Sequence, residues 1–452
     1  AQAGDLILVA AGNYNSGGRP APGKALTNRV TIAKAVTVAS SSGAGQTFIV
    51  GSGPVGNAAI RCAYLTNGAA LNGFTLERGR TRVGSAAWSQ DASGGGAYLD
   101  HGGSVSGCVV RANAAYFGGG VFLFGGTAQD LTVVSNTALA QPASGGGAYC
   151  YGGVISNSLL CANTASYGGG AFCDEGGIID GSRIVQNTAA QLAGGVFCAS
   201  GGMVRGSFLG SNTAGERGGG SYCWRGGTAR NALISTNRAA DGAGVYCDRG
   251  GRLENCKVAS NTAAGAGGGL YSWFGGRVVN SILYGNSAAD GRNWFSIGGS
   301  DVYSYVCTTP SPPRGDHNIF VNPQFANPAQ GNYRLASSSP CLDRAIQLAW
   351  MPGAYDLDGR PRIWINSADL GCFELNPTNL NADTDGDFMP DWWEWKYFGH
   401  VINTAPGFDG DVDEYGALEE YVAGTDPNDG NSLLAMTRET VRGTGAIITW
   451  SS

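Results

Sequence analysis

The chain has 452 residues and a net charge of −6, and 76 of its residues are glycine, about 17% against a usual ~7%. Collagen is excluded because there are only 16 prolines and no strict Gly-X-Y period, and disorder is excluded because 43% of the residues are apolar and 10% aromatic. Residues 383–429 hold 13 acidic residues against one basic residue, Lys396, a local charge of −12 that leaves +6 for the rest. Neither part has the basic cluster that nucleic-acid binding needs.

No stretch approaches the ~20 apolar residues of a membrane-spanning helix, and the first residues lack the basic start and apolar core of a signal peptide. We therefore expect a mature or excised piece, with no membrane span in this chain. Twelve cysteines without a CxxC pair favour an oxidising compartment over a zinc site or a cytosolic redox motif. The expected localisation is secreted, extracellular or at the cell surface.

An internal repeat runs from about residue 5 to about residue 300. Two markers recur together about every 25 residues, an Asn usually followed by Thr-Ala and a Gly-Gly pair. The Asn stands at Asn113, Asn136, Asn163, Asn187, Asn212, Asn237, Asn261 and Asn286, and the first glycine of the pair at Gly102, Gly125, Gly152, Gly176, Gly201, Gly226, Gly250 and Gly275. Short apolar runs separate these turn residues. The spacing predicts an all-β right-handed parallel β-helix with three short strands per coil, glycines at the corners and an asparagine ladder.

Weaker copies of the repeat precede these coils. Tyr64 matches Tyr98, and residues 78–93 between them are expected to form an inserted loop. Apolar runs between residues 30 and 50 are expected to be earlier strands.

The strand after each triple glycine carries two ladders on opposite faces, because successive side chains of a strand alternate. The aromatic ladder is Tyr64, Tyr98, Phe122, Tyr149, Phe172, Phe197, Tyr222, Tyr246 and Tyr271. The other ladder contains Cys150, Cys173, Cys198, Cys223 and Cys247. Two positions after the aromatic stand Asp100, Asp174 and Asp248, and an unpaired buried Asp is costly, so we expect the aromatic ladder outside and the cysteines inside.

An outward aromatic stripe has two interpretations, and the sequence leaves both open. It is either a docking surface for a partner or a glycan, or a stack that stabilises itself by roughly 0.5 to 1.5 kcal/mol per ring pair.

The cysteines also leave alternatives. Five cysteines in one ladder allow at most two bridges between coils; a Cys247–Cys256 bridge and buried free thiols are the other possibilities. We expect a disulfide between Cys341 and Cys372, which would close a loop in a region with little regular core.

The acidic segment contains two 12-residue stretches with carboxylates at positions 1, 3, 5 and 12, the spacing with which a loop surrounds calcium. The predicted ligands are Asp383, Asp385, Asp387, the carbonyl of Met389, Asp391 and Glu394 in the first loop, and Asp409, Asp411, Asp413, the carbonyl of Tyr415 and Glu420 in the second. Phe388 and Glu414 stand at position 6, where an EF-hand has glycine. We expect two structural calcium ions, with short helices at residues 392–398 and 418–423.

One strand is expected at the C-terminus, at residues 445–450, with no local partner. Either it belongs to a following β-sandwich or it pairs with another subunit, through Ala446, Ile447, Ile448 and Trp450.

The GGG-A-Y and N-T-A markers resemble those of secreted bacterial right-handed parallel β-helix repeat proteins, a branch of the pectate-lyase-like superfamily, and are similar to the repeats of polymorphic outer-membrane proteins. Residues 280–374 resemble a choice-of-anchor segment, and the acidic loops resemble bacterial thrombospondin type 3-like calcium repeats and, more distantly, EF-hand and dockerin loops. The expected domains are a β-helix at 1–300, its C-terminal cap or choice-of-anchor-like segment at 301–376, the calcium-binding module at 377–432 and a strand segment at 433–452.

These features predict a non-catalytic extracellular structural or adhesive protein that could assemble end to end with copies of itself or bind cell-surface components. One alternative is a carbohydrate-binding surface protein that uses the aromatic ladder. A second alternative is a polysaccharide lyase or hydrolase, but Asp174 and Asp248 are three coils apart, about 14 Å, too far to act as an acid/base pair. His101 and His317 are expected to be surface or turn residues.

Overall fold

The computed structural model describes residues 1–84, 89–139, 144–364, 367–375, 383–398, 400, 402, 404–432, 435–442 and 445–451. The chain forms two compact units. The first comprises Ala1–Ile346, Tyr355–Arg360 and Asp369–Glu374, and the second comprises Gln347–Ala354, Pro361–Ala368 and Leu375–Ser452. None of the described helices is long and apolar enough to cross a membrane.

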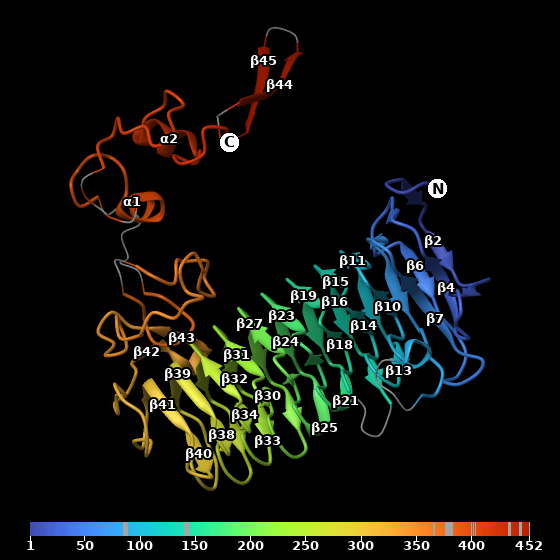
Figure 1. Ribbon diagram of the computed structural model, residues 1–452, viewed down its shortest axis with the longest axis horizontal. Helices are drawn as coiled ribbons and strands as arrows, with labels where there is room; N and C mark the ends of the chain where they lie inside the picture. The colour runs from blue at the N-terminus through green and yellow to red at the C-terminus, as the bar shows by residue number, and fades with distance from the viewer. Residues whose placement is uncertain are drawn as a thin grey trace. The chain divides into compact units, whose positions relative to one another are not determined.

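The first unit is a parallel β-helix, which confirms the predicted fold class (Figure 1). A regular coil places one strand in a 12-stranded sheet, two in a 22-stranded sheet and one in a 7-stranded sheet. The expected three strands per coil become four, because a left-handed residue bends the chain within the 22-stranded sheet.

The 12-stranded sheet consists of β3 (Arg19–Pro20), β4 (Thr27–Ile32), β7 (Ile60–Leu65), β10 (Ala97–Asp100), β14 (Val121–Phe124), β18 (Ala148–Tyr151), β22 (Ala171–Asp174), β26 (Val196–Cys198), β30 (Ser221–Trp224), β34 (Val245–Asp248), β38 (Leu270–Trp273) and β40 (Trp294–Ile297). The 7-stranded sheet consists of β13 (Ala114–Ala115), β17 (Thr137–Ala138), β21 (Thr164–Tyr167), β25 (Thr188–Leu192), β29 (Thr213–Ala214), β33 (Arg238–Ala239) and β37 (Thr262–Ala263).

In the 22-stranded sheet, the strands before the bend are β1 (Leu6–Val9), β5 (Thr37–Ser40), β8 (Ala70–Asn72), β11 (Ser104–Ser106), β15 (Thr127–Gln129), β19 (Val154–Ser156), β23 (Ile178–Asp180), β27 (Met203–Arg205), β31 (Thr228–Arg230) and β35 (Arg252–Glu254). Those after it are β2 (Gly12–Tyr14), β6 (Thr47–Val50), β9 (Thr75–Glu77), β12 (Val109–Arg111), β16 (Thr132–Val134), β20 (Leu159–Cys161), β24 (Arg183–Val185), β28 (Phe208–Gly210), β32 (Leu233–Ser235) and β36 (Lys257–Ala259). The longer strands β39 (Arg277–Tyr284) and β41 (Val302–Thr308) pass through the bend and carry the solenoid beyond its predicted end near residue 300.

The bend within the 22-stranded sheet and the next corner of each coil use different residues. At the bend, the left-handed residues are Gly107, Asp130, Asn157, Gly181, Gly206, Asn231, Asn255 and Asn280, which are types that adopt positive φ at low cost. At the next corner they are mostly ordinary residues: Ala112, Ser135, Ala162, Gln186, Ser211, Thr236 and Ser260. Each of these costs roughly 1–2 kcal/mol, so another interaction must hold the second corner.

The predicted asparagine ladder lies at this second corner and provides that interaction. Asn212 is typical and is fully buried. Its Nδ2 donates to the Ile184 carbonyl at 2.9 Å and to Asn237 Oδ1 at 3.0 Å. Its Oδ1 accepts from the backbone N–H and from Nδ2 of Asn187, both at 3.0 Å. The ladder ends on Asn293, whose Oδ1 accepts from the Asn286 backbone at 3.1 Å.

The triple glycines have two separate functions. The first member takes a left-handed conformation, as Gly218 does with φ 70°. The other two lie against the next coil, where a Cβ on Gly219 would be 2.5 Å from the Ala243 carbonyl and a Cβ on Gly220 2.6 Å from the Gly244 carbonyl. A Cβ at Gly219 or Gly220 would force the neighbouring coil to shift, which explains much of the glycine excess, although the next coil accommodates Ala243 at the middle position.

The cysteine ladder faces the interior, as predicted, and its five thiols are fully buried among aliphatic side chains. The aromatic ladder points away from this interior, but it is not the exposed stripe that a docking surface requires. Its rings stack at centroid separations of 4.6–5.7 Å, and all except the half-buried Phe172 are at most 7% exposed. Phe117, Tyr167 and Leu192, from the corner before each triple glycine, pack against the stack. The self-stabilising stack is therefore the interpretation that the geometry favours.

The three aspartates beside the ladder hold tyrosine hydroxyls of the preceding coil. Tyr64 donates to Asp100 at 2.9 Å and Tyr222 donates to Asp248 at 2.7 Å. Tyr149 donates to Asp174 at 3.3 Å. The aspartates therefore satisfy hydroxyls that the stack buries.

Replacement of Tyr222 by Phe should lower the free energy of unfolding by about 1.5 kcal/mol, because a hydrogen bond to a charged acceptor is lost. Replacement of Tyr246 by Phe is the matched control, since the next coil has Trp273 in place of an aspartate, and it should change the free energy by less than about 0.5 kcal/mol. Urea unfolding of both variants measures the difference. Equal losses would show that the Tyr–Asp bond contributes nothing.

The predicted Cys341–Cys372 disulfide is wrong: none of the twelve cysteines forms a disulfide, and these two lie in different apolar clusters. After β41 the chain folds over the outer face of the 22-stranded sheet, where η2 (Pro328–Gln330) joins β42 (Phe325–Asn327) to β43 (Asn332–Leu335). Cys372 packs beside Leu233 and Ala259, whereas Cys341 packs with Cys307.

Both α-helices of the described residues, α1 (Asp391–Phe398) and α2 (Ala417–Ala423), lie in the second unit, within a residue of the predicted bounds. Gly424 ends α2 in a left-handed conformation.

The expectation of a C-terminal strand without a local partner is wrong: β45 (Gly445–Ser451), which contains Ala446, Ile447, Ile448 and Trp450, pairs antiparallel with β44 (Ala435–Arg442). One further short element, η1 (Gln90–Ala92), lies in the inserted loop of the first unit.

Candidate metal centres

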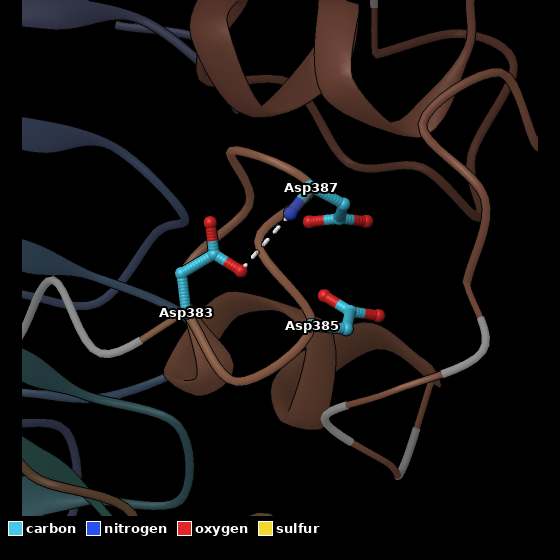
Figure 2. Close-up of side chains that lie close together, drawn as sticks. All are labelled: Asp383, Asp385 and Asp387. Atoms are coloured by element: carbon cyan, nitrogen blue, oxygen red, sulfur yellow. Dashed lines mark hydrogen bonds between the residues drawn. The ribbon is translucent and has the colours of Figure 1, made fainter.

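The first acidic loop brings three carboxylates together, with one oxygen from each of Asp383, Asp385 and Asp387 within 4.8 Å of the others (Figure 2). The Asp383 carboxylate organises the loop by accepting three backbone N–H groups, from Gly386 at 2.7 Å, Asp387 at 3.1 Å and Phe388 at 2.9 Å. The Met389 N–H donates to Asp387 Oδ1 at 2.9 Å. These bonds fix the carboxylates on one side of a tight turn.

The second loop repeats this arrangement position by position. Asp409, Asp411 and Asp413 have oxygens within 4.8 Å of one another. The Asp409 carboxylate accepts from the N–H groups of Val412, Asp413 and Glu414 at 2.7, 3.2 and 3.1 Å, and Tyr415 donates to Asp413 at 2.9 Å. Two sequences that share only their acidic spacing therefore adopt the same loop.

The missing glycine at position 6 does not prevent the turn. Phe388 and Glu414 both take the left-handed conformation there, with φ of 74° and 79°. The residue at position 4 also takes the left-handed conformation; it is Gly386 in the first loop, with φ 74°, and Val412 in the second, with φ 65°. The three N–H groups bound by the first aspartate of each loop hold this backbone in place of the conformational freedom of glycine.

The glutamate at position 12 of each loop is buried beside the aspartates. Glu394 is 0% exposed and neither of its oxygens has a hydrogen-bond partner; Glu420 is 2% exposed and its Oε2 has none. Burial, followed by the charges of the loop aspartates, raises the pKa of both glutamates to about 7. Among the described residues, no Lys, Arg or His forms an ion pair with any loop carboxylate.

Uncompensated buried carboxylate oxygens are costly, and a cation among them removes the cost. The donors are all oxygens, which suits a hard cation such as calcium. The residues that would hold it are Asp383, Asp385, Asp387 and Glu394 with the Met389 carbonyl, and Asp409, Asp411, Asp413 and Glu420 with the Tyr415 carbonyl. These are the predicted ligands, with one exception.

The remaining predicted ligand is Asp391, at position 9, and it also has a structural role. Its Oδ1 accepts the Thr384 backbone N–H and its Oδ2 accepts the Thr384 hydroxyl, both at 2.7 Å. Asp391 therefore joins the start of α1 to the beginning of the loop. Its role as a ligand at position 9, where a carboxylate often acts through water, stays a prediction.

The two loops share one small apolar core. Met389 and Trp393 of the first loop and its helix are buried with Ala417 at the start of α2, and Leu418 and Tyr421 pack against them. The Asn428 side chain adds a hydrogen bond to the Tyr397 carbonyl at 3.2 Å. A change in one loop can therefore reach the other through direct contacts.

A groove of about 750 Å³ lies in the first unit, between the outer face of the 22-stranded sheet and the chain that folds over it. Leu159, Arg183, Phe208 and Leu233 line one side and Tyr333, Arg334, Leu357, Asp358 and Phe373 the other. Arg334 is paired with Asp358 at 2.5 and 2.6 Å and stacks over Phe373. Arg183 stacks over Phe208 at 4.7 Å, is exposed, and has no acidic partner among the described residues.

Sequence reasoning missed this groove. The signal available was a set of outward-facing apolar residues, Leu159, Phe208 and Leu233, at one position of the coil, with Arg183 at this position between the first two.

The histidines of the first unit are placed as surface residues. His101 is exposed, with its Nδ1 2.7 Å from Asp100 and its ring against Phe124. His317 stacks on Tyr305 at 4.5 Å. Because Asp100, Asp174 and Asp248 hold tyrosine hydroxyls, a catalytic role for these residues finds no support in the arrangement.

The first unit places the chain among proteins with a parallel β-helix fold. No family model and no curated protein matches the chain. Among solved structures, the crystal structure of pectate lyase Pel9A is similar at 13% sequence identity with a TM-score of 0.40, over 83% of this chain and 89% of that chain. A likeness of this size supports no statement about activity.

Proposed function

We propose that the chain is a non-catalytic extracellular structural or adhesive protein whose second unit is held folded by two structural calcium ions. The observation that carries the proposal is the pair of buried glutamates, Glu394 and Glu420, each facing three aspartates without a basic partner among the described residues. Extracellular calcium, at about millimolar concentration, suits even weak sites of this kind. Copies of the chain and cell-surface components remain the proposed partners. Exchange of β45 between subunits is not part of the proposal, because β45 pairs with β44.

The test is whether calcium, and not magnesium, makes residues 383–432 resistant to protease. Magnesium is the informative comparison because it demands octahedral geometry and dehydrates reluctantly, whereas calcium accepts six to eight oxygens from a flexible loop. Equal resistance with and without a chelator would overturn the calcium part of the proposal.

The groove favours a second candidate function, the binding of an acidic polysaccharide. It replaces the aromatic ladder as the proposed glycan site, because the ladder rings are buried. Apolar and aromatic surface at Leu159 and Phe208 suits the faces of sugar rings, and the unpaired guanidinium of Arg183 suits a carboxylate or sulfate group.

Replacement of Arg183 by Ala should weaken binding of acidic polysaccharides about tenfold, since a charge-assisted hydrogen bond contributes roughly 1.5–3 kcal/mol. Replacement of Arg238, an exposed arginine on the 7-stranded sheet, is the matched control and should leave binding unchanged. Glycan arrays with the full chain measure the binding, and chromatography of the bound polysaccharide should show no cleavage. Binding that is insensitive to Arg183→Ala would exclude the groove.

A further inference from the structure

The sulfur atoms of Cys307 and Cys341 lie together in an apolar cluster at the end of the β-helix. Both residues are fully buried and pack with Ile282, Leu335 and Leu370. The interaction between the two sulfurs raises the pKa of Cys307 and lowers that of Cys341. The Cys307 thiol donates its proton to the Val321 carbonyl at 3.4 Å. The two cysteines come from different structural elements, since Cys307 is in β41 and Cys341 is in the turn after β43.

We propose that Cys307 and Cys341 are a redox site that closes to a disulfide and fastens the segment between them to the last coil of the β-helix. That segment contains the β42–β43 hairpin, whose Tyr333 and Arg334 form part of the groove wall. Closure of the bond therefore fixes one wall of the groove. The inference does not depend on calcium or on a groove ligand.

The interior cysteine ladder is a poorer site for such a bond. Its members face one another across in-register parallel strands, as Cys198 and Cys223 do. Such strands hold equivalent Cβ atoms about 4.8 Å apart, beyond the roughly 3.5–4.5 Å of a disulfide, and the ladder of hydrogen bonds resists closer approach. Cys341 lies in an irregular turn outside the sheets, where its N–H donates to the Ser339 hydroxyl and its carbonyl accepts from the Leu370 N–H. Both thiols are fully buried, so an oxidant reaches them when the segment after β41 opens locally.

The oxidant is a low-molecular-weight disulfide such as oxidised glutathione. The Cys341 thiolate attacks one of its sulfur atoms, and the first glutathione thiolate leaves. The Cys307 thiol then loses its proton and attacks the Cys341 sulfur of the mixed disulfide, so that the second glutathione leaves. The protein loses two electrons and two protons, and the oxidant is reduced to two thiols.

The test treats the full chain with oxidised glutathione, alkylates the remaining thiols in denaturant and maps the peptides without reduction. The expected result is a loss of two of the twelve thiols, with the peptide that contains Cys307 linked to the one that contains Cys341. Cys372→Ser, the matched control, should still lose two thiols, whereas Cys341→Ser should lose none.

Alkylation of both Cys307 and Cys341 in the oxidised wild-type chain would overturn the proposal, as would a link from Cys341 to any other cysteine. Because this readout is made on the wild-type chain, a variant that fails to fold does not obscure it. In the linked protein, trypsin should cleave more slowly after Arg334, and a reductant should restore the rate. Cleavage that is unaffected by the link would overturn the fastening of the groove wall.

Discussion

Calcium will protect the second unit from protease, and removal of calcium by a chelator will expose it. Without a cation, each loop holds four carboxylates close together, and two of the eight, Glu394 and Glu420, are almost fully buried. One bound ion stabilises the folded loop by about 2.7 kcal/mol when its concentration is 100 times the dissociation constant. Limited proteolysis across a calcium titration, with mass identification of the cut sites, measures the effect on residues 383–432.

Single glutamate variants separate metal binding from a general effect of charge. Glu420→Gln removes a ligand and should shift the calcium midpoint for protection at least tenfold, because one of the charged oxygens that closes the second loop is lost. Glu414→Gln in the same loop removes an equal charge from an exposed side chain and should shift the midpoint less than twofold. Equal shifts would mean that the loops respond to net charge and do not hold an ion. Calcium titration of the unmodified chain should give a stoichiometry of two calcium ions per chain.

The periodic features of the chain could be predicted from sequence because each of them recurs in every coil. The Asn and Gly-Gly markers fixed the coil length, and the strand register follows from them without knowledge of any tertiary contact. The same reasoning placed the cysteines inside, and the 1, 3, 5, 12 spacing identified both acidic loops. Local sequence determines these features because the interacting residues stand at constant intervals.

Features that depend on non-periodic neighbours could not be predicted in this way. The aromatic ladder faces outward as expected, but it is covered from a position whose residue type changes between coils. Phe117, Tyr167 and Leu192 stand there, whereas another coil has Ser144. Asn293 ends the asparagine ladder although it follows Asn286 by only seven residues, outside the repeat interval.

The groove and the C-terminal hairpin were missed for similar reasons. One side of the groove comes from residues 331–373, which are far in sequence from the coils that they face. The partner strand β44, with the sequence AMTRETVR, has too few apolar residues to give a strand pattern.

The largest effect of a single substitution is expected in the asparagine ladder. Asn212→Ala removes four side-chain hydrogen bonds and leaves the Ile184 carbonyl and the Asn187 N–H without partners in a fully buried position. At about 1 kcal/mol for each net hydrogen bond, with a further penalty for buried groups left unpaired, the expected loss is about 4 kcal/mol. The substitution also affects Ser211, the left-handed residue before Asn212, because the hydrogen bonds of the Asn212 side chain no longer hold this corner of the coil.

Because a solenoid is stabilised by contacts between neighbouring coils, this loss should be local. Hydrogen exchange of the full chain should therefore accelerate most in the coils of β24, β28 and β32 and least near β5 and β6, where the wild-type contacts are intact. Thr213→Ala, at the exposed residue next to Asn212, is the control and should change the free energy of exchange by less than about 0.5 kcal/mol. Uniform acceleration along the whole β-helix would mean that the coils unfold as one cooperative unit. Acceleration no larger than that of the control would mean that the asparagine ladder does not hold the second corner of each coil. The glycines at the other turns of the coil would then determine its shape.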